Sequence, residues 1–149
     1  MRNREVENWR KRWLSSINEL TSIELQRTSW LDKENTNPHW SFVEFMCCYF
    51  DDLVIDDNYK YQLENNWITE TEYQIILKWH SELDNYEAPS KDDYDVVKIL
   101  EDKNWLRIVD LGEKVKEKLA NQLPENEIKI LTEMTDYTKH KTVKKENES

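Results

Sequence analysis

The chain has 149 residues, a length that suits one domain, with 31 acidic and 21 basic residues and a single glycine. Between Trp13 and Thr138 the imbalance is larger, with 27 acidic against 12 basic residues and a formal charge of −15. A body of this charge repels nucleic acid and anionic membranes, and the lone Gly112 excludes the glycine-rich loops that hold nucleotide phosphates. So little glycine also predicts few turns with positive φ, which favours helices over hairpins.

The N-terminal part of the chain predicts one long amphipathic helix followed by a loop. Apolar residues recur at intervals of three and four, which predicts a helix over residues 4–20 with an apolar stripe toward the core. Residues 21–30 either continue this helix or begin a short one. Residues 32–38 are polar, and Asn37-Pro38 predicts that they form a loop.

The next segment predicts a helix that ends among carboxylates. Residues 39–53 are apolar almost all round, which is typical of a helix at the centre of a domain. Negative charge is unfavourable at the end of a helix because the dipole is already negative there. We therefore single out the four acidic residues that follow, Asp51, Asp52, Asp56 and Asp57.

The second half of the chain predicts further helices joined by short turns. Residues 59–65 suit a short helix, and Thr69 with Glu72 forms the pattern of a capping box at the start of a helix that reaches Tyr86. After a loop over 87–93 we expect a helical turn over 96–100, a longer helix capped by Asp102, and, beyond Leu123-Pro124, a last helix through Met134. The prediction is all-α: a single compact domain over 1–138, an irregular bundle of about six helices, with a disordered lysine-rich tail over 139–149.

No group of side chains has the spacing of a known reaction centre. The three histidines, His39, His80 and His140, lack the spacing of metal-binding motifs, and Cys47 and Cys48 are interpreted as buried reduced thiols. We therefore expect no catalytic residue, no metal and no cofactor. His80 lies four residues before Asp84, and the pair is interpreted as a histidine held by one carboxylate.

The basic residues near the N-terminus do not predict a nucleic-acid site. Arg10, Lys11 and Arg12 lie on the first helix between two tryptophans. A few cations beside so acidic a body bind phosphate weakly, so we expect a solvated helix face.

Two acidic clusters are the candidate binding sites. Each combines carboxylates, which attract basic side chains, with a tyrosine, which supplies rigid contact area, and this mixture suits a protein interface. The alternative is a solvated surface whose charge keeps the protein soluble. The candidate partner-binding residues are Tyr49, Asp51, Asp52, Asp56 and Asp57 in the first cluster and Glu82, Asp84, Tyr86, Asp92, Asp93 and Asp95 in the second.

Three segments carry a resemblance to a known class of proteins. Residues 41–53 (SFVEFMCCYFDDL), residues 68–86 with their ending WHSELDNY, and Asn104-Trp105-Leu106 resemble small bacterial immunity proteins of polymorphic-toxin and contact-dependent inhibition systems. The resemblance implies a cytoplasmic protein without enzymatic activity that binds one cognate toxin and covers its active site. We expect the protein itself to be a monomer or weak homodimer. Many nuclease toxins are basic, and an acidic inhibitor suits such a target.

Two other functions are weighed against this one. An adaptor or regulatory protein would use the same acidic surface on another basic partner. A metal-dependent hydrolase would need Glu44, Asp51 and His80 to converge in a pocket. The sequence has no run of 18 apolar residues and no apolar N-terminal segment, so we expect neither a membrane span nor a signal peptide.

Overall fold

The computed structural model describes residues 3–34 and 39–133, and within these residues all regular structure is helical. The elements are α1 (Arg4–Leu20), α2 (Ile23–Trp30), α3 (Phe42–Phe50), α4 (Asp56–Glu64), α5 (Glu70–Asp84), a 3₁₀ turn η1 (Pro89–Lys91), α6 (Val96–Glu101), α7 (Lys103–Ala120) and α8 (Glu125–Thr132). The all-α prediction is confirmed. The described part of the chain holds eight α-helices rather than about six, because short segments such as α2 and α6 form helices of their own. The Asn37-Pro38 turn, Met134 and the tail over 139–149 lie outside the described residues.

Local capping signals place several helix starts as the sequence predicts. The Thr69 hydroxyl accepts the Glu72 backbone N–H at 3.0 Å, and the Glu72 carboxylate accepts the Thr69 backbone N–H at 2.9 Å. The predicted capping box is therefore present at the start of α5. Asp102 caps α7 by accepting the Asn104 backbone N–H at 3.2 Å.

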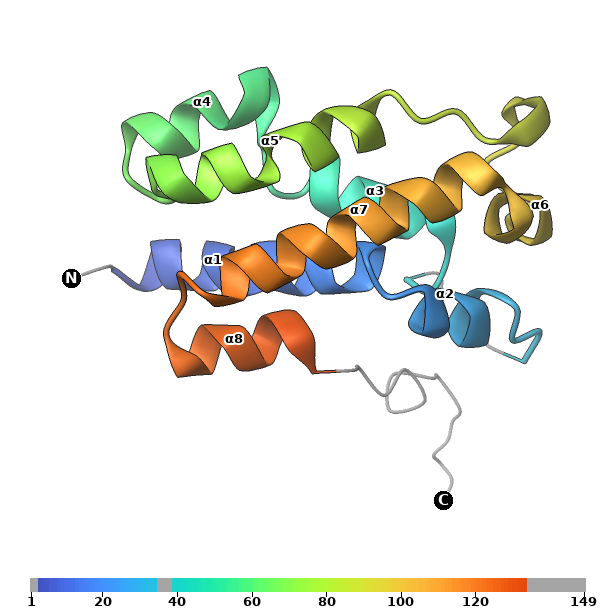
Figure 1. Ribbon diagram of the computed structural model, residues 1–149, viewed down its shortest axis with the longest axis horizontal. Coiled ribbons are helices and arrows are strands. Elements are labelled where there is room, and N and C mark those ends of the chain that lie inside the picture. The colour runs from blue at the N-terminus through green and yellow to red at the C-terminus, as the bar shows by residue number, and fades with distance from the viewer. Residues whose placement is uncertain (1–2, 35–38, 134–149) are drawn as a thin grey trace.

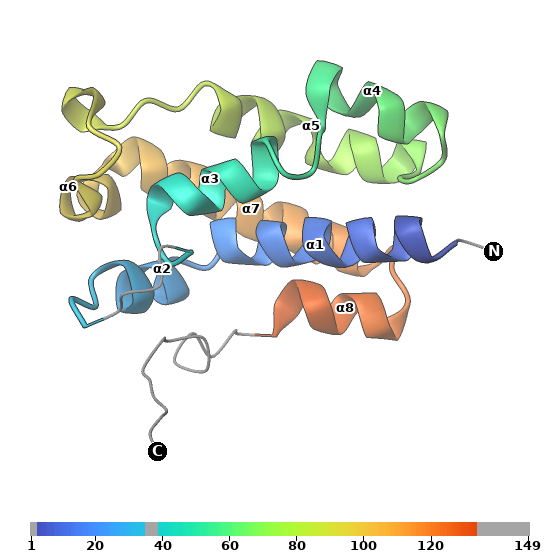
Figure 2. The same cartoon turned by 180° about the vertical axis from the view of Figure 1, so that it is seen from behind.

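Helix α1 lies at the centre of the molecule. Figures 1 and 2 show α7 across one face of α1, with α3 above α1 and α8 below it, and α1 contacts all three helices. The prediction of a central helix after residue 38 is wrong, because α3 buries only Phe42, Phe45 and Tyr49 completely and leaves its other side chains partly exposed. An apolar pattern shows which side chains avoid water, but it does not show how many helices pack around them.

A buried arginine joins α1 to two distant helices. Arg10 is fully buried, and its five N–H groups make five hydrogen bonds: two to Glu72, two to Glu127 and one to the Trp67 carbonyl, at 2.8–3.0 Å. Its guanidinium also lies 5.2 Å from the ring centroid of Trp13. The expectation of a solvated face is wrong for Arg10, because two carboxylates far along the chain replace its water, while Lys11 and Arg12 are exposed.

The single glycine allows close packing in the interior. Gly112 lies in α7, where a Cβ atom would collide with Thr21 Cγ2 and would lie 2.7 Å from Trp79 Nε1. Thr21 and Trp79 are both fully buried. A larger side chain would therefore push α7 away from the chain that follows α1 and from α5.

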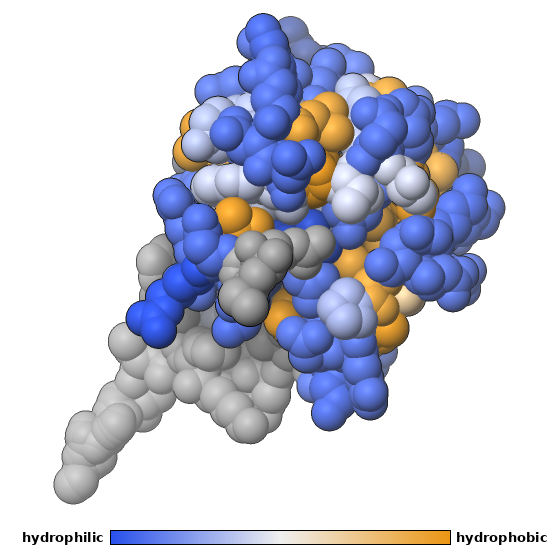
Figure 3. Space-filling model, turned by 90° about the vertical axis from the view of Figure 1, so that its left-hand side faces the viewer, coloured by the Kyte–Doolittle hydropathy of each residue, from blue (hydrophilic) through white to orange (hydrophobic). Residues whose placement is uncertain are grey.

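The end of the molecule at which α1 begins is mostly polar. Figure 3 views this end, and hydrophobic residues appear there as separate patches within a hydrophilic surface. The two hollows that concern function lie on either side of the segment between α3 and α4.

Candidate partner-binding site

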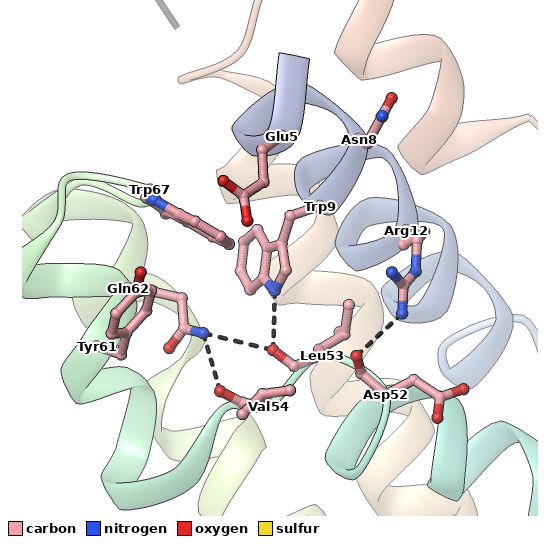
Figure 4. A pocket seen from close by; sticks show the side chains of 10 residues that line it. All are labelled: Glu5, Asn8, Trp9, Arg12, Asp52, Leu53, Val54, Tyr61, Gln62 and Trp67. Atoms are coloured by element: carbon pink, nitrogen blue, oxygen red, sulfur yellow. Dashed lines mark hydrogen bonds between the residues drawn. The ribbon is translucent and has the colours of Figure 1, made fainter. Parts of the chain in front are cut away.

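The segment over residues 51–57, here called the acidic loop, is held in place through its backbone. Figure 4 shows three side chains that donate hydrogen bonds to its carbonyls: Arg12 to Asp52 and Trp9 to Leu53, both at 2.9 Å, and Gln62 to Val54, also at 2.9 Å. The first two donors come from α1 and the third from α4. These bonds hold the backbone, and the carboxylates of the loop are exposed.

The loop and the start of α4 contain backbone in the left-handed region. Val54, Asp57, Asn58 and Tyr59 have φ between 51° and 68°. The expectation of few positive-φ turns is wrong, because non-glycine residues adopt this conformation at seven positions of the described chain. Asn and Asp tolerate it, but a β-branched or aromatic residue is strained there, at a cost of about 1–3 kcal/mol each.

One side of the loop forms a hollow of about 550 Å³, here called the acidic hollow. Asp51, Asp56 and Asp57 line it from the loop, and Asp84 lines it from the end of α5. All four side chains are exposed. Within the described residues none of these carboxylates forms an ion pair with lysine, arginine or histidine. The remaining lining residues are Phe50, Ile55, Asn58 and His80.

A chain of buried polar groups leads from the core to this hollow. The Trp13 indole N–H donates to the Tyr59 hydroxyl at 3.0 Å, the Tyr59 and Tyr49 hydroxyls are in contact, and the Tyr49 hydroxyl lies 2.9 Å from Nδ1 of His80. Because an indole can only donate, the direction that satisfies every group has Tyr59 donating to Tyr49 and Tyr49 donating to His80. His80 Nδ1 is then an acceptor, and the Nε2–H edge of the ring is left to face the hollow.

Burial keeps His80 neutral. Its side chain is almost fully buried, and this burial lowers the pKa of His80 below its ordinary value, an effect that nearby Asp84 opposes in part. Burial likewise raises the pKa values of Tyr49 and Tyr59. The hollow therefore combines exposed negative charges with a neutral, firmly oriented imidazole at its inner surface.

The other side of the loop forms a second hollow, of about 460 Å³, here called the aromatic hollow. Figure 4 shows Trp9 of α1 facing Trp67, with Tyr61 of α4 beside them. The ring centroids of Trp67 lie 5.7 Å from Trp9 and 5.4 Å from Tyr61, both edge to face. Tyr61 and Val54, which is also in the lining, are among the most exposed large apolar side chains of the described chain. Carboxylates and rings are thus placed next to each other at the surface.

The structure changes the membership of the two predicted clusters. Tyr49 is fully buried and Tyr86 nearly so, with its hydroxyl donating to Asp102 at 2.8 Å, so the prediction that these tyrosines lie on a binding surface is wrong. Each ring fills space between helices, and a sequence pattern cannot show that. The exposed tyrosines are instead Tyr61, in α4, and Tyr94, in the loop before α6.

The second cluster is not a single site. Asp84 belongs to the acidic hollow, whereas Glu82 pairs with Arg107 of α7 at 2.7 Å, and this hydrogen bond lowers the pKa of Glu82. Asp95 caps α6 by accepting the Lys98 backbone N–H, and its carboxylate lies 3.8 Å from Lys98 Nζ. Asp92 and Asp93 are exposed in the loop before α6, where Asp92 accepts the Tyr94 backbone N–H. The carboxylates of the second cluster thus lie at separate places: the acidic hollow, an ion pair, a helix cap and an exposed loop.

The three residues of the hydrolase alternative do not form one set. Asp51 and His80 line the acidic hollow, but Glu44 is not part of its lining. The Glu44 carboxylate lies instead with His39 and Cys48, and the ligand atoms of these three residues are within 4.8 Å of one another. That group is the arrangement in the described residues that suits a metal ion, and it is separate from the acidic hollow.

Comparison of the chain with protein-family models, with curated proteins and with solved structures found no match. In the part of the chain that the structure describes, no helix has the length and apolar character needed to cross a membrane. Function is therefore inferred from the geometry and charge of the site, together with the resemblance to immunity proteins that the sequence carries.

Proposed function

We propose that this protein is a non-catalytic, cytoplasmic binding protein that neutralises a basic toxin by taking basic side chains of the toxin into the acidic hollow. One observation carries the proposal: Asp51, Asp56, Asp57 and Asp84 come from two separate segments, line one hollow, and form no ion pair within the described residues. A lysine or arginine from outside would supply the missing positive charge.

Electrostatics and backbone order both favour this role. Four carboxylates around one hollow repel one another, and a cation that enters relieves that repulsion. A negative face also increases the rate of encounter with a basic protein, and this gain falls as salt increases. Because Trp9, Arg12 and Gln62 already hold the loop backbone, binding does not have to order it.

The aromatic hollow supplies contact area beside the charges. Exposed Tyr61 and Val54 offer apolar surface, and Asp52 lines the same hollow. Interfaces commonly combine an aromatic anchor with surrounding polar groups, and the anchor contributes most of the affinity. The acidic loop would accordingly lie at the centre of the contact.

The test compares two variants of equal charge. In the first, Asp51, Asp56, Asp57 and Asp84 are changed to Asn. In the matched control, four exposed carboxylates elsewhere, Glu24, Glu101, Glu113 and Glu117, are changed to Gln. Each tagged variant and the unaltered chain are used to recover partners from the native host at low and at physiological salt.

The expected result is a basic polypeptide that the unaltered chain and the control retain and that the Asn variant loses. That polypeptide, expressed alone, should stop growth of a test bacterium, and co-expression of the unaltered chain should restore growth. Equal retention by the Asn variant and the control would refute the acidic hollow as the site. A retained partner that is harmless when expressed alone would favour the adaptor function over toxin neutralisation.

A further inference from the structure

The start of α3 brings three different metal-binding side chains together. Glu44 and Cys48 are four residues apart on α3 and therefore share one face of the helix. His39 precedes the helix, and its Nδ1 lies 3.8 Å from the Cys48 sulfur. Each ligand atom of the three residues lies within 4.8 Å of the other two.

These separations suit a tetrahedral zinc ion. With Zn–S near 2.3 Å and Zn–N or Zn–O near 2.0–2.1 Å, two ligand atoms of one zinc ion are about 3.3–3.6 Å apart. The distance between His39 and Cys48 is already close to this range, and rotation of the Glu44 side chain moves its carboxylate without any change in the helix. A set of imidazole, thiolate and carboxylate is typical of zinc and not of magnesium or calcium, which bind oxygen ligands.

A fourth residue orients the histidine. His39 Nε2 lies 2.9 Å from a carboxylate oxygen of Glu19, whose side chain is only 8% exposed at the end of α1. When Nε2–H donates to this carboxylate, the lone pair of Nδ1 is directed toward Cys48 and Glu44. Metal-binding histidines almost always have such a carboxylate or carbonyl partner on their second nitrogen, which fixes the tautomer.

The rings of Trp40 and Phe45 pack against the imidazole of His39. Their centroids lie 4.8 Å and 5.7 Å from that of His39. Trp40 and Phe45 are buried, whereas His39, Glu44 and Cys48 are partly exposed. An ion can therefore enter from solvent, and the histidine remains in place before it arrives.

We propose that His39, Glu44 and Cys48 bind one zinc ion, with Glu19 as the residue that positions His39. Three protein ligands leave the fourth position to water or to an external ligand. The site ties the segment before α3 to the end of α1, and it is independent of the proposed partner-binding function.

The experiment uses the full-length chain without a tag, freed of metal with a chelator and kept reduced without added thiol. Co²⁺ is titrated first because a thiolate ligand gives a sulfur-to-cobalt charge-transfer band. We expect one Co²⁺ per chain, a band of this kind, and its loss when Zn²⁺ is added in equal amount.

Adjacent cysteines provide the matched control. Cys48→Ser should abolish the charge-transfer band, whereas Cys47→Ser should leave it unchanged, because Cys47 lies beside Asp51 and outside the group of three. Glu19→Gln should keep the band and weaken binding by about 10- to 100-fold, as is usual when the partner of a metal-binding histidine is lost. Circular dichroism checks that each variant keeps its helical signal. If Cys48→Ser fails that check, His39→Gln takes its place, because the His39 ring is partly exposed.

Three results would each overturn the proposal. The first is the absence of a charge-transfer band in the unaltered chain at a Co²⁺ excess. The second is an equal loss of the band in the Cys47→Ser and Cys48→Ser variants. The third is a Glu19→Gln variant that binds as tightly as the unaltered chain, which would remove the positioning role.

Discussion

Replacement of Arg10 is the sharpest test of how the core is held together. Arg10→Met keeps a long apolar side chain beside Trp13 but removes all five hydrogen bonds and the positive charge between Glu72 and Glu127. The two carboxylates are only 2% and 7% exposed, so water does not readily replace the guanidinium. Burial alone would lower the pKa of Arg10, but the two carboxylates raise it above its ordinary value, which shows how strongly they favour the charged form.

The magnitude follows from the cost of a broken buried ion pair. Removing one partner of such a pair costs about 3–5 kcal/mol, and here two carboxylates lose the same partner. We therefore expect at least about 4 kcal/mol, a large share of the roughly 5–15 kcal/mol by which a domain is stable. At about 2–4 °C per kcal/mol for a chain of this size, the melting temperature should fall by roughly 8–16 °C.

The assay is urea and thermal unfolding, followed by circular dichroism at neutral pH. Lys11→Met is the matched control, since Lys11 is the exposed neighbour of Arg10, and we expect its effect to stay within about 0.5 kcal/mol. Arg10→Met combined with Glu72→Gln and Glu127→Gln should recover much of the loss, because no buried charge then remains without its partner. A loss below about 1 kcal/mol for Arg10→Met, or a triple variant as unstable as the single one, would refute the reasoning.

Two further predictions concern Gly112 and His80. Gly112→Ala should lower the melting temperature, because the clash with Thr21 and Trp79 costs about 1–3 kcal/mol and the gain in helix propensity returns only about 1 kcal/mol. Adding Thr21→Ser to this variant removes the nearest methyl group and should restore part of the lost stability. A raised melting temperature in Gly112→Ala would contradict the close packing. His80 has a lowered pKa in the folded chain, so the unfolded chain binds the proton more readily and stability should fall as the pH drops below about 6.5, by at most about 1.4 kcal/mol per pH unit. The measurement is urea unfolding with chelator at several pH values between about 7.5 and about 5, on either side of the ordinary histidine pKa. His80→Gln should reduce the dependence of stability on pH, and an equal dependence in the two proteins would exclude His80 as its source.

The sequence predicts those parts of the fold that depend on neighbouring residues. The stripe of α1, the capping box at Thr69 and the cap at Asp102 all act within a few residues, and the structure contains each of them. The same holds for the all-α class, since helical periodicity is a local property.

Long-range contacts explain where the sequence analysis is wrong. Arg10 bonds to residues 62 and 117 positions away, so its neighbours Lys11 and Arg12 give no sign that it is buried. Tyr49 and Tyr86 look like contact residues beside carboxylates, but α5 and α7 cover them. A polar pattern near a helix end cannot distinguish an exposed tyrosine from one that bridges two helices.

The sequence predicts only part of the candidate site, because long-range contacts complete it. The sequence marks Asp51, Asp56 and Asp57 as one cluster because they are close along the chain. It groups Asp84 with Glu82, whereas in the structure Asp84 lines the acidic hollow and Glu82 pairs with Arg107. Successive helical positions point about 100° apart, so two carboxylates in one cluster of the sequence belong to different surfaces.

The acidic loop concentrates several costs to stability in one place, and that concentration supports a binding role. Val54 and Tyr59 hold strained backbone angles, and four carboxylates line one hollow without an ion-pair partner in the described residues. Strain of this kind persists only where the surrounding structure enforces it, here through the hydrogen bonds that α1 and α4 donate to the loop. The acidic residues of a merely soluble surface need neither the strain nor the convergence, because dispersed charges keep a protein soluble equally well. A surface that presents negative charge to a basic partner gains from both convergent charges and an ordered loop, because a loop that is already ordered loses less entropy on binding.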